Sequence, residues 1–509
     1  MKPIAGTVVI DEQGLDLADF ERVVTHQSPV QVSQACHKAV SDCRAFLDRV
    51  LDDGRIVYGV NTGFGKLASV ILPEEQTRAL QVNLIRSHAC GVGAPYSEDV
   101  VRGMMLLRLV SLTRGYSGVR PVVVEMLMAC LNEGIHPVIP QQGSLGASGD
   151  LAPLAHLSLV LLGEGEAILG GKRIPGAEAL QQAGIEPLTL QAKEGLALIN
   201  GTQAMTAVGL IAYLKAKRVM DAANAAAALT MEALHATLHP FAEGIQRVRP
   251  FPEQAAIARD IRRYLAGSHL VREPGRDKVQ DAYALRCIPQ VHGASLRALR
   301  HVQETLEIEM NAVTDNPLLF PDENAVYSGG NFHGQPIALA MDYLKIAVAE
   351  LANIAERRTE RLVNPQLNEG LPAFLAPDAG QSSGLMILQY VSASLVSENK
   401  VLAHPASVDS IPSSGNQEDH VSMGTTSARQ ANQIVDHAAT VLAIELICAA
   451  QAVVFRGVEH ASLISRRVIE WVHRYVAPYA GDRSYSRDIA QLADAICRGE
   501  LSDVLAKGK

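Results

Sequence analysis

The feature of the sequence that most limits its fold is a series of long helical patterns that begins near residue 203. The first of them, 203-QAMTAVGLIAYLKAKRVMDAANAAAALTMEALHATLH-239, contains no proline until Pro240, which cannot continue a helix. Further helical patterns follow at roughly 293–313, 335–362, 382–403 and 421–455. Because several of these segments exceed 20 residues and are joined by loops rich in Pro and Asn, such as 314-TDNPLLFPDENA-325, we expect an up-down helical bundle.

Two of these helices carry an apolar stripe suited to the core of such a bundle. The first stripe has spacings of 4, 3, 4 and 7 residues and consists of Leu344, Val348, Leu351, Ala355 and Leu362. A similar stripe consists of Leu299, Val302, Leu306 and Val313. Such spacing places the side chains on one helix face. We therefore predict a mainly α fold, with a long up-down helical bundle domain over residues 203–509 and a loop-rich domain over residues 1–202.

Composition narrows the classes of partner. The net charge of −9 and the absence of a Lys/Arg cluster indicate that the protein has no basic surface for binding nucleic acid. We therefore expect a small-molecule substrate.

The sequence has no signal-peptide pattern at its start. Its longest apolar run, 438–455, is interrupted by Glu445 and Gln451 and indicates a buried helix, not a membrane span. Seven scattered cysteines without a CxxC pair favour reduced thiols in the cytoplasm and no structural zinc.

Residues 1–202 are rich in glycine and divided by turn clusters into short pieces, so each cluster was compared with known site patterns. The string 59-GVNTGFGK-66 lacks the spacing of a phosphate-binding loop, and Leu67 replaces its Ser or Thr. Residues 146–150 miss the GxSxG pattern of hydrolases because Asp150 occupies the last position. His235 and His239 are four apart on a predicted helix, but without HExxH we expect no metal there.

The tripeptide Ala147-Ser148-Gly149 has two interpretations. Ser148 or Asp150 can serve as the N-cap of the apolar helix that follows, with the glycines forming a turn. Alternatively, the amide nitrogen of Gly149 attacks the carbonyl carbon of Ala147 and closes a five-membered ring. Loss of water from the ring and of the Ser148 hydroxyl then leaves an exocyclic methylidene. Such an electrophile would make the amino group of an amino acid a better leaving group, and it requires small residues beside the serine.

Eight segments in one order decide between these interpretations, and they extend over most of the chain. They are 58-YGVNTGFG-65, 87-SHACGVG-93, 143-GSLGASGDLAPLAH-156, 198-LINGTQAM-205, 279-VQDAYALRCIPQVHG-293, 330-GNFHGQPIA-338, 364-NPQLNEGLPAFL-375 and 415-GNQEDHVSMG-424. In them the sequence resembles the aromatic amino acid ammonia-lyases that carry a methylidene-imidazolone (MIO) group, and most closely the members that act on histidine. The resemblance implies a fumarase/aspartase-like helical architecture and an MIO formed from Ala147, Ser148 and Gly149 without any external cofactor.

The resemblance also implies roles for individual side chains. Tyr58 matches the catalytic tyrosine proposed to take the β-proton, a task that requires a phenol with a pKa below the ordinary value of about 10. Arg286 matches the arginine that binds the substrate carboxylate. Tyr283 and Phe332 match positions that form or shield the electrophile. Asn200 would hydrogen-bond the imidazolone or the substrate carboxylate.

The resemblance implies that the choice of substrate depends on His88 and Glu418. This sequence has Ser87-His88 at the position where the family selects the substrate side chain. By the same resemblance, phenylalanine lyases have Phe-Leu there and tyrosine lyases have His-Leu. A histidine can hydrogen-bond an imidazole, and Glu418 could hold the other ring nitrogen or take part in proton transfer. One departure is that Ala282 and Ala284 stand where histidine lyases have proline and serine, which frees the backbone before Tyr283.

These implications predict the elimination of ammonia from L-histidine to give trans-urocanate, the opening step of histidine breakdown, by a cytoplasmic homotetramer with shared active sites. A tyrosine ammonia-lyase or an aromatic amino acid 2,3-aminomutase with the same electrophile is the neighbouring alternative. A fumarase-type lyase is a third, because 410-SIPSSGNQED-419 resembles its serine loop, although the expected lysine is missing. A non-enzymatic helical scaffold would leave the glycine-rich loops without a purpose.

Overall fold

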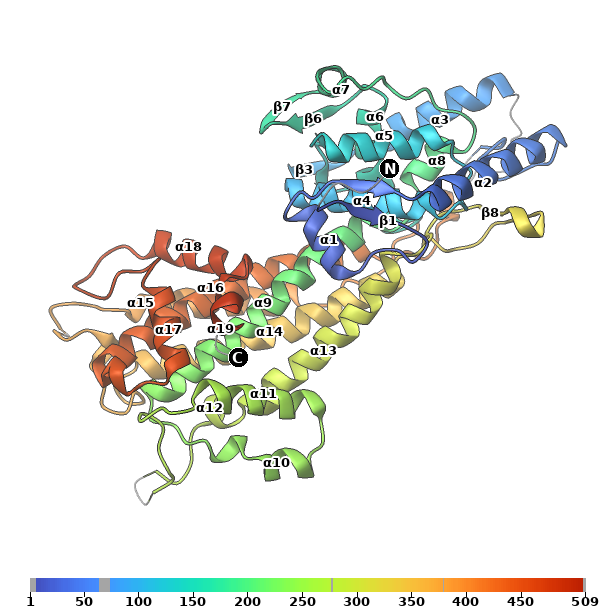
Figure 1. The fold of residues 1–509 in the computed structure, drawn as a ribbon. Coiled ribbons are helices and arrows are strands. Elements are labelled where there is room, and N and C mark those ends of the chain that lie inside the picture. The colour runs from blue at the N-terminus through green and yellow to red at the C-terminus, as the bar shows by residue number, and fades with distance from the viewer. Residues whose placement is uncertain (1–5, 64–73, 276–277, 379, 507–509) are drawn as a thin grey trace. The chain divides into compact units, whose positions relative to one another are not determined.

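The computed structural model describes residues 6–63, 74–275, 278–378 and 380–506, and it divides into two compact units (Figure 1). Unit 1 comprises Met1–Ile211, Glu304–Met341 and Pro405–Arg429, and unit 2 comprises Ala212–Gln303, Asp342–His404 and Gln430–Lys509. Each unit is therefore assembled from three chain segments. The expected boundary between residues 202 and 203 stays a prediction.

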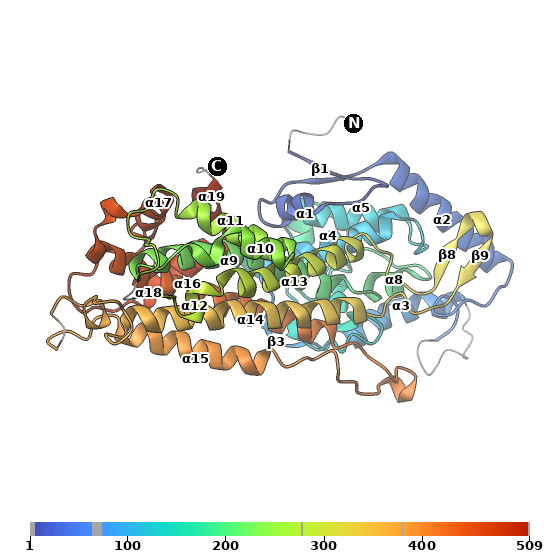
Figure 2. The same ribbon diagram turned by 90° about the horizontal axis from the view of Figure 1, so that it is seen from below.

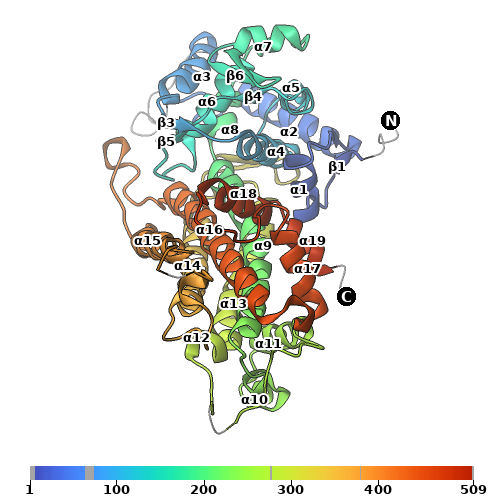
Figure 3. The same cartoon turned by 90° about the vertical axis from the view of Figure 1, so that its left-hand side faces the viewer.

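Long helices dominate unit 2 and confirm the mainly α fold. The expected long helices are α9 (Gln203–Ala233), α13 (Ile288–Glu309), α14 (Gln335–Val363), α15 (Met386–Leu402) and α16 (Gly424–Arg456). The shorter helices of this unit are α10 (Glu243–Val248), α11 (Pro252–Tyr264), α12 (Tyr283–Arg286), α17 (Leu463–Val472), α18 (Ser486–Cys497) and α19 (Glu500–Ala506). Within unit 2, α9, α13, α14 and α16 run alongside one another (Figures 1 and 3).

The predicted apolar stripes face the core. All five stripe residues of α14, from Leu344 to Leu362, are fully buried, and Leu299, Val302 and Leu306 of α13 are buried as well. Val313 lies beyond the end of α13 and is only half-buried. The helical spacing therefore identified the buried face correctly wherever the helix itself continues.

A polar cluster lies among the four long helices inside unit 2. The Arg358 guanidinium of α14 pairs with the Glu445 carboxylate of α16 at 2.6 Å, and neither side chain is exposed. Thr230 of α9 donates to the same carboxylate, and His292 of α13 contacts both Arg358 and Asn224. These contacts supply partners to charges that would otherwise be costly to bury.

Helix α16 is the one described helix long and apolar enough to cross a membrane, but 83% of its most apolar window is buried within the protein. Glu445 lies on it and has its partner inside unit 2. The helix therefore has the environment of a core helix, as its interruption by Glu445 and Gln451 predicted.

The end of α9 differs from the prediction. The helix ends at Ala233 and not at residue 239, because His235 adopts a left-handed φ of +48° and the Ala236 amide donates to the Met231 carbonyl. This arrangement closes a helix before any proline is needed. His235 and His239 consequently share no helix turn, and the expectation of both on one helix was wrong. His235 instead contacts the Leu270 carbonyl, and His239 contacts the Glu273 carboxylate.

Unit 1 combines helices with short strands. Its complete helices are α1 (Leu17–Val24), α2 (Gln34–Asp52), α3 (Glu74–His88), α4 (Glu98–Thr113), α5 (Pro121–Asn132), α6 (Leu151–Leu161), α7 (Gly176–Gln182) and α8 (Glu194–Ile199). Its strands are β1 (Val8–Ile10), β2 (Val30–Val32), β3 (Val92–Pro95), β4 (His136–Pro137), β5 (Pro140–Gln142), β6 (Glu166–Leu169), β7 (Lys172–Pro175), β8 (Leu318–Phe320) and β9 (Ala325–Tyr327). Helix α2, at 19 residues, is longer than the short pieces expected here.

The strands of unit 1 form small sheets that fasten its loops. β1 pairs with β2 in parallel, β3 with β5 and β8 with β9 pair antiparallel, and β4, β6 and β7 form a three-stranded sheet. The β8–β9 hairpin lies against α2, where Leu319 packs with Phe46 and Leu47 (Figures 1 and 2). Helices α3, α6 and α8 pack against one another. The end of α3, the start of α6 and the end of α8 each contribute residues to the cavity described next.

Candidate active site

A cavity of about 630 Å³ within unit 1 gathers most of the residues selected from the sequence. Six of the predicted site residues line it: Tyr58, His88, Ser148, Asn200, Phe332 and Glu418. A neighbouring cavity of about 250 Å³ is lined by Ala147 and Gly149 and shares His88 and Glu418 with the first. Loops and helix ends distant in the sequence therefore meet around the Ala147-Ser148-Gly149 tripeptide.

The backbone at Gly149 has room for no other residue. Its φ is +77°, and a Cβ there would lie 2.1 Å from the Gly201 carbonyl oxygen. Residues 149 and 201 form an isolated parallel bridge, in which the Asp150 amide donates to the Gly201 carbonyl at 2.7 Å. The left-handed φ and the close approach both require glycine. Ring closure would need an amide nitrogen that no Cβ hinders. The local packing also requires that residue 149 has no Cβ.

Ser148 is connected to Glu418 directly. The Ser148 hydroxyl donates to Oε1 of Glu418 at 2.9 Å, and the Ser413 hydroxyl donates to Oε2 at 2.9 Å. Backbone hydrogen bonds between residues 413 and 418 close the loop that carries the carboxylate. Conversion of Ser148 to a methylidene would remove one of these two donors and leave Oε1 available to a ligand in the cavity.

Asp150 is fully buried behind the tripeptide. It is the N-cap residue of α6, but its side chain makes no capping hydrogen bond. The carboxylate accepts instead from the Met205 amide at 2.7 Å, from Thr425 at 2.5 Å and from Ser144 at 2.9 Å. Burial raises the pKa of Asp150, although these three donors oppose the rise. The carboxylate therefore holds the loop against the start of α9.

The orientation of His88 is set by its own helix. Its Nδ1 lies 2.8 Å from the Leu84 carbonyl oxygen and 3.0 Å from the Ser87 hydroxyl. A carbonyl oxygen only accepts, so Nδ1 carries the proton in the neutral ring and Nε2 is left as an acceptor. His88 and the Glu418 carboxylate both line the cavity, and two hydrogen-bond acceptors in one cavity suit a ligand with N–H groups.

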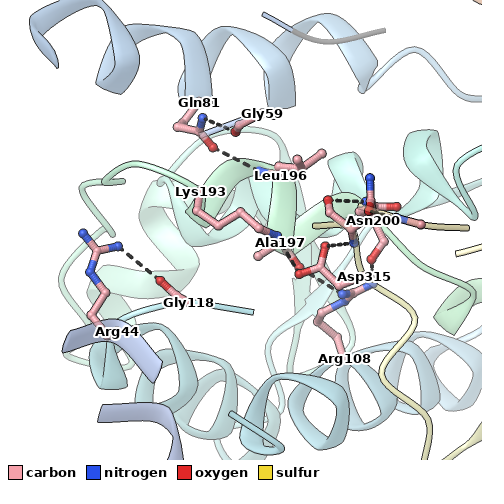
Figure 4. Close-up of polar contacts among 12 residues, drawn as sticks. Arg44, Gly59, Gln81, Arg108, Gly118, Lys193, Leu196, Ala197, Asn200 and Asp315 are labelled. Carbon is pink, nitrogen blue, oxygen red and sulfur yellow. Dashed lines mark hydrogen bonds and ion pairs between the residues drawn. The ribbon is translucent and has the colours of Figure 1, made fainter. Parts of the chain in front are cut away.

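Tyr58 follows α2 in a tight turn. The Gly59 amide donates to the Thr62 hydroxyl at 3.0 Å, and the buried Gln81 amide group contacts the Gly59 carbonyl and the Leu196 amide (Figure 4). Gln81 thereby connects the turn after Tyr58 with α3 and α8. The last two residues of the motif 58-YGVNTGFG-65 lie outside the described residues.

Tyr283 and Arg286 are placed differently from the other predicted residues. Both belong to α12 in unit 2, and among the described residues neither lines the cavity. Tyr283 is 71% exposed, and the Arg286 guanidinium stacks on its ring at 4.4 Å. Their assignment to the site therefore stays a prediction, as do the catalytic and binding roles of the residues that line the cavity.

Several cavity residues were not selected from the sequence. They are polar residues, of which Asn83 lies on α3 and the other four lie between the long helices: Asn83, Asn316, Ser328, Ser414 and Gln417. Ser413 and Ser414 lay within the noted string 410–419, and Asn316 within a loop rich in Pro and Asn. The density of Ser and Asn in those two loops was the available signal.

Comparison with known proteins identifies the family of the chain. The family model for aromatic amino acid lyases matches residues 15–474, and the chain belongs to that family. A histidine ammonia-lyase of Geobacillus thermodenitrificans is 59% identical over 501 residues, covering 98% of this chain and 99% of the relative. Another, from Geobacillus kaustophilus, is 64% identical over 445 residues, covering 87% of this chain and 88% of the relative.

Solved structures show the same fold. The histidine ammonia-lyase of Trypanosoma cruzi superposes with a TM-score of 0.92 at 40% identity, covering 99% of this chain and 95% of that one. A tyrosine aminomutase of Streptomyces globisporus gives 0.94 at 38% identity, covering 99% of both chains. The family expected from the eight segments is confirmed, and so is the class of enzyme, a carbon–nitrogen lyase.

Proposed function

We propose that the protein catalyses the histidine ammonia-lyase reaction, in which L-histidine loses ammonia without oxidation and becomes trans-urocanate. The observation that carries this proposal is that an acceptor on His88 and the Glu418 carboxylate belong to one cavity, which Ser148 also lines. A protonated imidazole offers an N–H group to each of the two acceptors and a neutral imidazole offers one N–H, whereas a phenyl ring offers none. The high identity to histidine ammonia-lyases over nearly the whole chain supports the same substrate.

The reaction requires an MIO, and we propose that Ala147, Ser148 and Gly149 form it without an external cofactor. The residues present fit the group, because the backbone at Gly149 excludes any Cβ and Ala147 is 91% buried beside it. When formed, the MIO supplies an electrophilic carbon that activates the amino group for departure. Asp150 would hold the loop in place while the ring closes.

The side chains around the cavity would divide the remaining work. Tyr58 or Glu418 would take the β-proton, and general base catalysis of this kind typically contributes about 10²–10⁴-fold. Asn200 and His88 would position the substrate, and Phe332 would shield the reacting end from water.

We further propose a homotetramer in which Tyr283 and Arg286 of the partner subunit complete the cavity. This proposal rests on their position on an exposed helix of unit 2, since neither is among the described residues that line the cavity. A guanidinium is well shaped to bind the substrate carboxylate. Mixing inactive Ser148→Ala subunits with inactive Arg286→Ala subunits should restore part of the activity, because mixed tetramers would contain intact sites. We expect the assembly in the cytoplasm, where the cysteines, all free in the structure, stay reduced.

Incubation with L-histidine tests the function. Purified protein should generate the near-ultraviolet absorbance of urocanate, and its intact mass should be lower than that of the unmodified sequence by two water molecules. Ser148→Ala should lose activity and retain the unmodified mass. Full activity of Ser148→Ala would refute the electrophile.

The second candidate is an aminomutase, because the likeness in fold to the tyrosine aminomutase is as close as that to the histidine lyase. Product analysis with L-histidine and L-tyrosine separates the two. A β-amino acid product, or turnover of tyrosine alone, would favour the aminomutase or a tyrosine lyase.

A further inference from the structure

An ion pair without any solvent exposure lies in unit 1, next to the cavity but outside its lining. The Lys193 ammonium, at the start of α8, is 2.7 Å from Oδ2 of Asp315, and both side chains are fully buried (Figure 4). Burial lowers the pKa of Lys193, and Asp315 opposes that change. Such pairs often contribute less stability than apolar residues of similar volume would. Stability alone therefore does not explain why Lys193 and Asp315 are both buried here.

The hydrogen bonds of Asp315 lead to Asn200. Oδ1 of Asp315 accepts from the Asn316 amide at 2.7 Å, and the Asn316 carbonyl accepts from the side-chain Nδ2 of Asn200 at 3.0 Å. Asn316 is further fixed because its side chain accepts from the Gly329 amide at 2.7 Å. The ammonium of Lys193 thus holds the carboxylate that orients the carbonyl to which Asn200 is bound.

A second buried cation holds the main chain of the same residue. The Arg108 guanidinium donates to the Asn200 carbonyl at 2.7 Å and to the Ala197 carbonyl at 2.9 Å, and it contacts the Gln203 side chain (Figure 4). These carbonyls belong to the end of α8, where no further helix turn supplies donors. Burial lowers the pKa of Arg108 to about 10, so it stays charged at neutral pH.

The orientation of the Asn200 amide follows from these contacts. Nδ2 donates to a carbonyl, so Oδ1 must be the other end of the group. Oδ1 is buried and finds no hydrogen-bond partner among the described residues. Leaving a buried acceptor without a hydrogen bond is unfavourable. Because Asn200 lines the cavity, a small movement of its side chain on ligand binding would bring Oδ1 within reach of a ligand group, and that group must be a donor.

We propose that Lys193 and Asp315 are positioning residues that orient the Asn200 side chain so that its Oδ1 accepts a hydrogen bond from an N–H of the bound amino acid. The proposal rests on the lyase function proposed above. It assigns Oδ1 to an N–H group of the substrate and excludes the substrate carboxylate as its partner, because a carboxylate has no proton to donate. Neither Lys193 nor Asp315 contacts the substrate in this scheme.

A double-mutant cycle between Asp315 and Asn200 tests the proposal. In the otherwise unchanged protein, Asp315→Asn should lower kcat/KM by roughly 10–100-fold, since small errors of placement have effects of this size. In an Asn200→Ala protein the same substitution should change kcat/KM by less than about 3-fold, because the group it positions is gone. Equal losses in both backgrounds would overturn the proposal and leave Asp315 a structural role only.

A charge-free variant covers the case in which Asp315→Asn fails to fold. The double variant Lys193→Met/Asp315→Leu removes both charges of the pair together, so the thermal unfolding midpoint should be largely retained, while kcat/KM should fall as for Asp315→Asn. Retention of full kcat/KM by this variant would overturn the proposal.

The matched control is a second ion pair without side-chain exposure among the described residues, and it lies in unit 2. Replacing Arg358 by Met together with Glu445 by Leu removes a pair with the same lack of exposure, and kcat/KM should stay within about 3-fold of the unchanged protein.

The unchanged protein is assayed first with L-histidine, L-tyrosine and L-phenylalanine. If L-histidine is not converted and another of these amino acids is, the proposed function is refuted. The double-mutant cycle is then measured with the amino acid that is converted, so that failure of the proposed function and failure of the positioning role are distinguishable.

Discussion

The two units bury their charges for different purposes. In unit 2, Arg358 and Glu445 connect helices whose backbone groups are already satisfied by their own helical hydrogen bonds. In unit 1, Arg108 and Asp150 donate to or accept from main-chain groups of loops and helix ends, which no helix satisfies. The comparison is between Arg358 and Glu445, which link regular helices, and Arg108 and Asp150, which fix irregular backbone next to the cavity. Changes in unit 2 should therefore alter stability first, and changes in unit 1 should alter activity first.

The largest effect is expected for Gly149→Ala in unit 1. The added Cβ would collide with the Gly201 carbonyl at 2.1 Å, so the main chain could not reach the arrangement needed for ring closure. Activity should fall by at least about 10⁴-fold, because the proposed electrophile would supply much of the rate enhancement, and mass spectrometry should find the unmodified chain.

Gly134→Ala is the matched control for this change. Gly134 has a similar φ of +69°, but a Cβ there meets no atom within 4 Å. Its substitution introduces the same backbone strain without the collision, and activity should be retained. Equal losses for both variants would mean that left-handed strain in general, and not the approach to Gly201, limits the enzyme.

The next effect concerns stability and belongs to unit 2. Glu445→Gln removes the carboxylate that neutralises Arg358, and loss of one partner of a buried ion pair typically lowers the free energy of unfolding by about 3–5 kcal/mol. Chemical denaturation should show this loss, while kcat at a temperature where the variant is folded should change little. Glu166→Gln, which breaks an exposed pair with Arg173, should leave stability nearly unchanged. A fall in kcat without a fall in stability for Glu445→Gln would contradict the contrast between the units.

The smallest effect is a dependence of stability on pH that arises from His292. Burial, aided by Arg358, lowers the pKa of His292 well below 6.5. The stabilisation is therefore complete above the unfolded-state pKa near 6.5 and is lost as the pH falls below it. The slope should approach about 1.4 kcal/mol of unfolding free energy per pH unit. Denaturation curves of His292→Gln should show a shallower slope between pH 6.5 and 5, and identical slopes would refute this assignment.

The long helices were predictable because their signal is local. The stripe from Leu344 to Leu362 repeats with the period of a helix, and each of its residues is buried. The end of α9 was not predictable in the same way. Its last turn closes through a left-handed histidine, His235, a conformation that most often requires glycine or asparagine, so the sequence carried no sign of it.

The candidate site was predictable to the extent that a family resemblance identified its motifs. Tyr58, His88, Asn200 and Glu418 line one cavity as those motifs implied. The supporting residues were not predictable, because Asp315 reaches Asn200 only through a main-chain carbonyl. No spacing along the chain encodes a contact of that kind. The assembly of each unit from three chain segments depends on similar long-range contacts, so it could not be predicted from the sequence either.

The bridge between residues 149 and 201 would make formation of the proposed MIO depend on folding. In a newly synthesised chain, the segment after α8 does not yet contact the tripeptide, so the ring could not close. The enzyme would therefore be inactive at first and become active only after its tertiary contacts form. The appearance of near-ultraviolet absorbance in newly made protein would then report the completion of folding, without any added dye or label.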